Sequence, residues 1–309
     1  MKYLNIFCFF VLVISTIIFG GYNYYRIQHS DNEGPAIQID NDILQVSVKD
    51  DKSEFLQGVT AIDSKDGDVT DSLGVESISG FKEDWTREVK YVAFDSNNNV
   101  TKASRFIQYA DYEPIHFSLD EPLRFPSDKG NTDILGIVHA TDCLDGDISN
   151  QISFAEGNVI YPSIASDYKI SLIVKNSAGD TERLPVTVTI YDPALEKDCP
   201  KIILKDYLIY TEKGKEVDLL ANIESVTFSG KEYTATSGRG TYDVDTSEMT
   251  REELSELDAE DQTVSLDKFS ISGDIDYNTP GVYEIKYSIN SPENDKGSVR
   301  LIVIVEEGE

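Results

Sequence analysis

Histidine, tryptophan and cysteine are scarce in this chain of 309 residues, which has three His, one Trp and three Cys. The histidines are His29, His116 and His139, and none belongs to a His-Glu-x-x-His pattern or stands beside a nucleophile motif. No glycine-rich phosphate-binding loop follows a strand-like segment. We therefore expect a protein that is not an enzyme, although its acidic residues are too numerous for counting alone to exclude a glycosidase.

Positive charge is also scarce. The chain has 27 Lys and Arg against 56 Asp and Glu, which gives a formal net charge of −29. Such a surface repels nucleic acid and anionic lipid, so we expect no nucleic-acid partner. Metal cations would be its natural small partners, but the simpler role of the acidity is to keep an exposed protein soluble. A hydrophobic content of 40% and an aromatic content of 10% favour folded domains over a disordered polyanion.

The longest hydrophobic run lies at the N-terminus. Residues 4–21 are almost wholly apolar, close to the minimum of roughly 17 residues for a membrane span. Tyr22, Tyr24 and Tyr25 follow at the position of an interfacial aromatic belt. The alternative is a cleaved signal peptide, but the run ends in Ile-Ile-Phe-Gly-Gly-Tyr, which fits a cleavage site poorly. We predict a membrane anchor at residues 1–25 and a juxtamembrane linker at 26–34, with the bulk of a single-pass chain outside the cell.

The remaining sequence repeats itself. Residues 58–71 (GVTAIDSKDGDVTD) and 136–149 (GIVHATDCLDGDIS) both lead from an alternating apolar stretch into an Asp-Gly-Asp turn. Residues 89–108 and 170–189 both read as strand, tight polar turn and strand, which is a hairpin pattern. Proline-containing linkers near residues 111–114 and 192–200 separate the copies.

A third, degenerate copy follows. Residues 279–305 again read as a hairpin, and residues 216–228 stand where we expect its first strands, without an Asp-Gly-Asp turn. An insertion at 229–265 begins as a loop or irregular hairpin and continues as a short helix that Thr250 and Glu253 would cap. We predict an all-β chain of three tandem immunoglobulin-like sandwiches, at residues 35–110, 111–193 and 198–307.

These turns resemble those of the bacterial Ig-like repeats of cell-surface proteins, related to hyaline-repeat and crystal-toxin modules. The matching residues in the second copy are Asp142, Asp145, Gly146 and Asp147, with the later turn at 176–180. The first copy has asparagines where that later turn usually has Ala-Gly, and asparagine tolerates the same positive φ. The resemblance covers residues 35–193 well and 198–307 loosely. It implies a stalk or adhesion role and no reaction.

The aspartates raise the possibility of calcium. In a seven-strand sandwich the Asp-Gly-Asp turn and the later turn lie at one end of their module, beside the preceding linker. We hypothesise a Ca²⁺ site there, because Ca²⁺ prefers such oxygen ligands. Its ligands between the first two modules would be Asp142, Asp145, Asp147 and Asn176 with Asp111 or Glu113; those in the first module would be Asp63, Asp66, Asp68 and Asp95. The alternative, which we favour, is that these residues only build turns.

The cysteines give no disulfide framework. Cys8 lies in the apolar N-terminal run, and the spacing of Cys143 and Cys199 matches no zinc motif. Cys143 would lie at one end of the second sandwich and Cys199 just beyond the other, whereas bridged Cα atoms lie within about 7 Å. We expect no bond between them.

The sequence thus favours an anchored stalk that presents its third module, far from the membrane, to an unknown protein or glycan at the cell surface. One alternative is a carbohydrate- or peptidoglycan-binding receptor, for which the lone Trp85 is a candidate stacking residue. Another is an accessory subunit of a membrane complex, held through the apolar helix.

Overall fold

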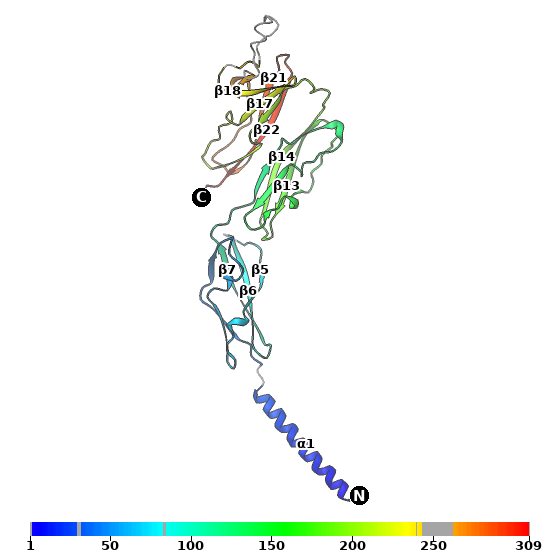
Figure 1. Ribbon diagram of the computed structural model, residues 1–309, viewed down its shortest axis with the longest axis vertical. Helices are drawn as coiled ribbons and strands as arrows, with labels where there is room; N and C mark the ends of the chain where they lie inside the picture. Colours follow the sequence, from blue (N-terminus) through cyan, green and yellow to red (C-terminus); the bar gives the residue numbers. More distant parts are fainter. Residues whose placement is uncertain (1, 30–31, 83–84, 239, 243–261, 309) are drawn as a thin grey trace. The chain divides into compact units, whose positions relative to one another are not determined.

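One helix precedes an all-β remainder in the computed structural model, which describes residues 2–29, 32–82, 85–238, 240–242 and 262–308. The helix, α1, spans Lys2–His29 (Figure 1). Within it, Ile6–Arg26 is 21 residues long, apolar enough to cross a membrane, and not buried against any other part of the protein. Its side chains have no protein core to pack against, which is expected of a segment that meets lipid or is removed as a signal sequence.

Each of the three modules is built from two facing sheets. The first module contains β1 (Ala36–Ile39), β3 (Val59–Asp63) and β4 (Gly67–Asp68) in one sheet, and β2 (Ile43–Val46), β5 (Gly74–Ile78), β6 (Thr86–Phe94) and β7 (Val100–Tyr109) in the other. The second contains β8 (His116–Leu119), β10 (Val138–Asp142) and β11 (Gly146–Asp147), facing β9 (Arg124–Pro126), β12 (Ser153–Phe154), β13 (Ser166–Lys175) and β14 (Thr181–Tyr191). The third contains β15 (Lys201–Leu204), β17 (Ile223–Phe228), β18 (Lys231–Thr236) and β19 (Thr263–Ser265), facing β16 (Leu208–Glu212), β20 (Ser270–Ser272), β21 (Gly281–Asn290) and β22 (Lys296–Glu306).

One of the two sheets has the same strand order in all three modules. The last two strands form an antiparallel hairpin, and the second strand pairs in parallel with the last, as β2 does with β7, β9 with β14 and β16 with β22. Alternate residues of each hairpin are buried because successive side chains of a strand point to opposite faces. The prediction of all-β sandwiches after one N-terminal helix is confirmed, as are the three predicted hairpins.

The third module differs from the sequence prediction in two places. Its first strand begins at Lys201, and of residues 216–228 only Ile223–Phe228 is a strand. The predicted insertion begins too early, because Lys231–Thr236 pairs with β17 across a turn at Ser229 and Gly230, both with positive φ, and so belongs to the sandwich. The helix predicted near Thr250 and Glu253 lies outside the described residues.

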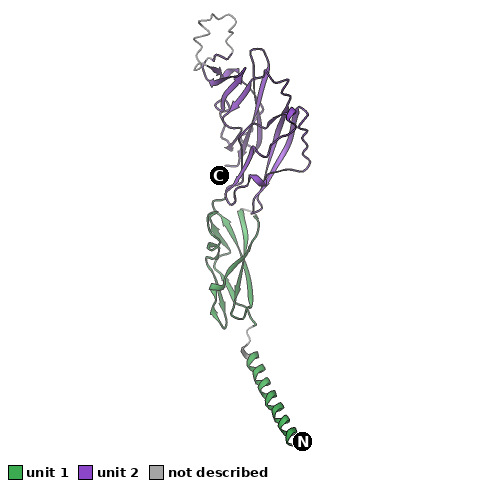
Figure 2. Cartoon of the chain, turned by 45° about the vertical axis from the view of Figure 1, so that its right-hand side comes forward, with its two compact units in different colours: residues 1–112 green, residues 113–309 purple. Residues whose placement is uncertain are grey.

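Two compact units make up the chain, Met1–Tyr112 and Glu113–Glu309 (Figure 2). The second unit contains two modules that lie side by side and run in opposite directions (Figure 1). Ile302 of β22 is buried in the core of the second module, and Leu208, Val282 and Ile304 pack against that core. The second and third modules therefore pack against each other, because an apolar face on each is buried against the other.

Candidate functional site

The Asp-Gly-Asp turn of the first module is held together by its own carboxylates. Asp63 Oδ1 accepts bonds from the backbone N–H groups of Lys65 and Asp66, both at 2.8 Å. Asp66 in turn accepts the N–H and hydroxyl of Ser96 at 2.7 and 3.0 Å, which ties the two predicted turns together. The Asp66 and Lys65 N–H groups lower the pKa of Asp63, and the bonds from Thr70 lower that of Asp68.

The second module repeats this arrangement. Asp142 Oδ1 accepts the N–H groups of Leu144 and Asp145 at 2.9 Å, and its Oδ2 accepts the amide of Asn176 at 3.0 Å. Asp145 binds the N–H and hydroxyl of Ser177 at 2.6 and 2.7 Å. The hydroxyl and N–H of Ser149 lower the pKa of Asp147. The two turns of each module are therefore neighbours, as the topology argument predicted.

The turn between the last two strands of each module begins with a side chain that accepts backbone hydrogen bonds. Asp95 Oδ1 accepts the N–H groups of Asn97 and Asn99 at 2.9 and 2.7 Å in the first module. Asn176 Oδ1 accepts the N–H of Asp180 at 2.9 Å in the second. Ser291 Oγ accepts the N–H of Asp295 at 3.0 Å in the third. A carboxylate, an amide and a hydroxyl thus perform one task, which needs an acceptor oxygen but no charge.

These bonds bear on the calcium hypothesis. Within the part of the chain that the structure describes, no three His, Cys, Asp or Glu side chains are grouped so that they could hold a metal ion. Asp111 instead accepts the hydroxyl of Ser47 at 2.6 Å and the N–H of Val48 at 2.8 Å in the first unit. The geometry fits the turn-building role, and calcium binding stays a prediction that titration tests.

The cysteines are free thiols. Burial raises the pKa of both Cys143 and Cys199, which keeps the thiols protonated and poorly nucleophilic at neutral pH. Cys143 Sγ lies 3.2 Å from the carbonyl oxygen of Glu113 and 3.4 Å from its nitrogen, so it fastens the start of the second unit. Cys143 and Cys199 therefore lack the lowered pKa of an activated cysteine nucleophile.

Trp85 belongs to an aromatic cluster in the first unit. Its ring centroid lies 5.6 Å from that of Phe81 and 4.7 Å from that of Tyr112, and Phe81 also contacts Tyr109. The side chain is 39% exposed, and the residue has a φ of 54°, which is uncommon for a bulky residue. The Trp85 ring therefore packs against other aromatic rings at the end of the core, and part of its surface remains exposed to solvent.

Sequence reasoning missed the buried Arg105, which is 3% exposed. Its guanidinium donates to the carbonyl oxygens of Phe55 and Gln57 at 2.9 and 2.6 Å, and to the Tyr91 hydroxyl at 2.8 Å. The repeat aligns Arg105 with the apolar Val186 of the second module. That mismatch between copies was the one signal in the sequence that pointed to a special residue.

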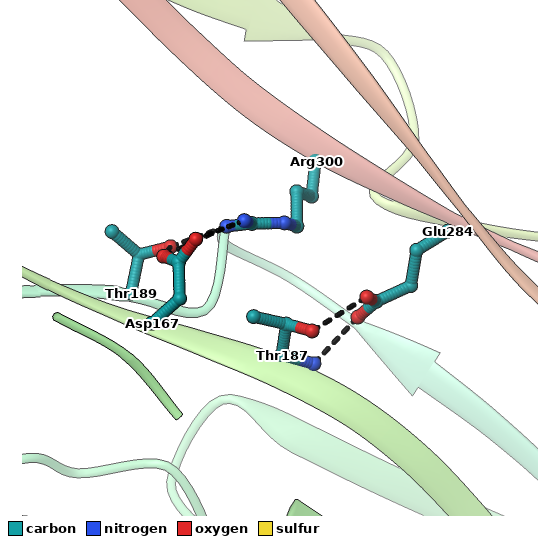
Figure 3. Close-up of polar contacts among 5 residues, drawn as sticks. All are labelled: Asp167, Thr187, Thr189, Glu284 and Arg300. Carbon is teal, nitrogen blue, oxygen red and sulfur yellow. Dashed lines mark hydrogen bonds and ion pairs between the residues drawn. The ribbon is translucent and has the colours of Figure 1, made fainter. Parts of the chain in front are cut away.

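The junction between the second and third modules was also not foreseen. Here we call the polar contacts between strands β8, β13 and β14 and strands β16, β21 and β22 the module junction. Arg300 donates to Asp167 at 2.5 and 3.3 Å and to the Thr189 hydroxyl at 2.5 Å (Figure 3). Burial opposes ionisation of Asp167, but the bonds from Arg300 and Thr189 outweigh it and lower the pKa of the carboxyl.

Glu284 completes the centre of the junction. Its two carboxylate oxygens accept the N–H and the hydroxyl of Thr187 at 2.5 and 2.6 Å (Figure 3). Because charge-assisted bonds are stronger than neutral ones and Thr187 is largely buried, this pair fixes the register of one module against the other.

Comparisons with known proteins leave the family open. No family model matches the chain, and no curated protein matches it. A Clostridium perfringens ZmpB structure, comprising the M60 catalytic domain with the CBM51-1 and CBM51-2 domains, is 13% identical, with a TM-score of 0.22, over 89% of this chain and 31% of that one. The protocadherin GammaB4 extracellular domain is 12% identical, with a TM-score of 0.20, over 89% of this chain and 50% of that one.

Mouse cadherin-23 EC22–24 is 13% identical, with a TM-score of 0.20, over 90% of this chain and 100% of that one. The chain spans only about a third to a half of the ZmpB and protocadherin chains. At such identities and TM-scores, these likenesses say nothing about what the chain binds.

Proposed function

We propose that this chain is a membrane-anchored protein with its sandwiches outside the cell, where they bind a partner and catalyse no reaction. The observation that carries the proposal is the unburied apolar stretch Ile6–Arg26, joined to modules that have their own cores. A helix of this composition is unstable in water without a partner, and a lipid bilayer supplies one.

The non-catalytic role rests on how the polar residues are used. The Asp-Gly-Asp carboxylates accept backbone N–H bonds, and the thiols of Cys143 and Cys199 have raised pKa values. Catalytic groups instead have pKa values matched to proton transfer or attack near neutral pH. The resemblance to bacterial Ig-like repeats supports the same assignment, as does an acidic surface suited to an exposed, soluble ectodomain.

Anchoring is tested on the full chain expressed in its host membrane. We expect it to resist carbonate extraction, to dissolve in detergent, and to have an intact mass that includes residues 1–25. The double substitution Leu12→Lys and Ile14→Lys, which adds about 2.5–3.5 kcal/mol per lysine at the helix centre, should release it. A mature chain beginning after Gly20 or Gly21 would show a cleaved signal peptide and overturn the anchor.

Binding is tested by cross-linking on intact cells, followed by purification in mild detergent. Recovery of a stable stoichiometric membrane complex would favour the accessory-subunit role over the adhesion role. Exposure of the modules outside the cell is checked by their digestion with protease added to intact cells, while an internal marker survives.

A glycan-binding role is a second candidate because Trp85 is partly exposed and its backbone is held in an unfavourable conformation, a feature enriched at ligand sites. Trp85→Ala should abolish retention on a glycan or cell-wall column. Tyr161→Ala is the matched control, since Tyr161 is 57% exposed but lies in the second module. Equal retention of both variants and the parent would exclude stacking at Trp85.

A further inference from the structure

Apolar side chains are exposed on one surface of the first module, the outer side of the sheet that contains β2, β6 and β7. Ile43 and Phe106 are register partners and are 51% and 37% exposed. Phe94 and Val100, register partners beside the turn of the hairpin, are 41% and 48% exposed. Buried residues alternate with these four along the strands, so the four side chains point away from the core. We call this surface the first-module face.

The third module shows what happens to the equivalent surface there. Ile302 lies as far beyond the turn between the last two strands as Phe106 does, and its register partner Leu208 takes the place of Ile43. Ile302 is only 3% exposed because it is buried in the core of the second module, and Leu208 packs against the same core. One position is therefore 37% exposed in the first module and 3% exposed where another sandwich covers it.

The polar centre of the module junction recurs as well. Glu284, which accepts the bonds of Thr187 across the junction, is matched by Glu88, at the same distance before the turn. Glu88 instead pairs with Lys82 of its own module at 3.4 Å, and these two side chains are 29% and 47% exposed. The first-module face thus has the residue types of a surface that packs on another sandwich.

The charges on this face favour a particular partner. A net charge of −29 makes two copies of the chain repel each other in general. On the first-module face, however, Lys90 and Lys102 project on the same side as Glu88, and Lys82 lies 4.7 Å from the centroid of the Phe106 ring. Because both signs of charge are present, two copies of this face that meet in opposite directions can pair unlike charges.

We propose that the first-module face binds the same face of a second copy of the chain, so that the protein is a dimer in its membrane. The other two modules of the same chain already cover each other (Figure 1). They meet through the outer faces of equivalent hairpins and run in opposite directions, and an isologous dimer likewise opposes two copies of one surface.

This inference names a partner for the proposed function and rests on it in one respect, the anchor. Residues 30–35 are all that separates α1 from β1, and six residues span at most about 20 Å. Two copies anchored in one bilayer therefore keep their first modules at similar heights, where equivalent faces can meet.

The test is cysteine cross-linking of the full chain in membranes. Ser104→Cys places a thiol on the first-module face with little change in size, and a short bis-maleimide should join two chains there. Thr60→Cys is the matched control, because Thr60 is also exposed but lies on β3 in the opposite sheet. The parent, with its own three cysteines, gives the background. We expect roughly tenfold more homodimer from Ser104→Cys than from Thr60→Cys, a ratio that a modest interface energy supplies.

A second substitution identifies the surface that holds the dimer. Phe106→Glu, added to Ser104→Cys, removes an aromatic contact and brings two like charges together, so the yield should fall roughly 30-fold. Ile62→Glu, at a residue 47% exposed on the opposite sheet, should leave the yield unchanged. Ile43→Glu, on the edge strand β2, repeats the test in case Phe106→Glu alters the fold, which the fluorescence of Trp85 reports.

Equal yields from Ser104→Cys and Thr60→Cys would overturn the proposal, as would a homodimer that survives both glutamate substitutions in folded chains. A product in which Ser104→Cys is joined to a chain of different mass would also overturn it, by showing that the face binds another protein. Carbonate extraction of the same samples separates this failure from failure of the anchor: a chain that resists extraction yet gives no homodimer refutes the dimer and not the membrane span.

Discussion

The buried Arg105 gives the sharpest prediction for the first unit. Arg105→Met keeps an unbranched apolar side chain about as long as the aliphatic stem of arginine and removes all the donors. The carbonyl oxygen of Gln57 then loses its bond, whereas that of Phe55 keeps the Tyr91 hydroxyl at 2.7 Å. Gln57 is an exposed residue and its carbonyl bond is only partly buried, so water can replace the lost donor there, whereas each lost bond to a charged donor contributes about 1.5–3 kcal/mol.

These losses are opposed by the desolvation of the guanidinium, since its three acceptors are two carbonyl oxygens and a phenol and include no carboxylate. Weighing the two, we expect Arg105→Met to lower the free energy of unfolding by about 2–3 kcal/mol. For a module of this size that corresponds to a fall in Tm of about 8–24 °C.

The assay uses tryptophan fluorescence, because Trp85 is the only tryptophan and lies in the first unit. Urea unfolding followed by this signal reports on the first unit alone. Arg183→Met, at an exposed position of the second unit, is the control and should leave the transition within about 0.5 kcal/mol.

If Arg105→Met is neutral or stabilising, desolvation of the charge outweighs its hydrogen bonds, as it does for some buried ion pairs. A double-mutant cycle with Tyr91→Phe should then give no coupling, whereas we expect a coupling of about 0.5–3 kcal/mol.

Four further outcomes are expected. Gly146→Ala forces alanine to a φ of 72° although no atom lies within 4 Å of the added Cβ, so strain alone should cost about 1–2 kcal/mol in calorimetry. Glu284→Ala leaves the Thr187 N–H without its acceptor and should lower the Tm of the second unit by about 2–10 °C. Millimolar Ca²⁺ should leave both Tm values unchanged, and a rise of several degrees would show that the carboxylates bind the ion. Acid should weaken the first unit below about pH 4, because the lowered pKa of Asp63 means that its contribution is lost as pH falls; fluorescence of Trp85 that stays constant down to pH 2 would contradict this.

The strands and hairpins could be predicted because their determinants are local. Alternation of apolar residues over 170–189 sets which face of the hairpin is buried. Turn residues fix where it reverses: Asn98 has a φ of 63° and Gly179, its counterpart in the second module, a φ of 93°. The neighbouring positions of the two aspartate turns followed from strand order alone.

The spacing of the aspartates in the sequence did not determine which groups their carboxylates bind. Asp66 and Ser96 are 30 residues apart, and whether a carboxylate faces a backbone N–H group or an ion depends on distances of a few tenths of an ångström. The recurrence of aspartate, asparagine and serine at one turn position settles its role as an acceptor only once the three modules are superposed by their strands.

The side-by-side packing of the second and third modules was decided by tertiary structure alone. Thr187 and Glu284 are 97 residues apart, and nothing near either one indicates the other. The sequence of a half-buried strand has the same pattern of apolar residues whether its apolar face packs inside its own module or against a neighbouring module. The hydrophobic effect has no direction, so the pattern does not identify the surface that the face packs against. The sequence by itself determined the modules, through the two-residue period of strands and the positive φ of turns; only the folded chain determined which of their faces meet.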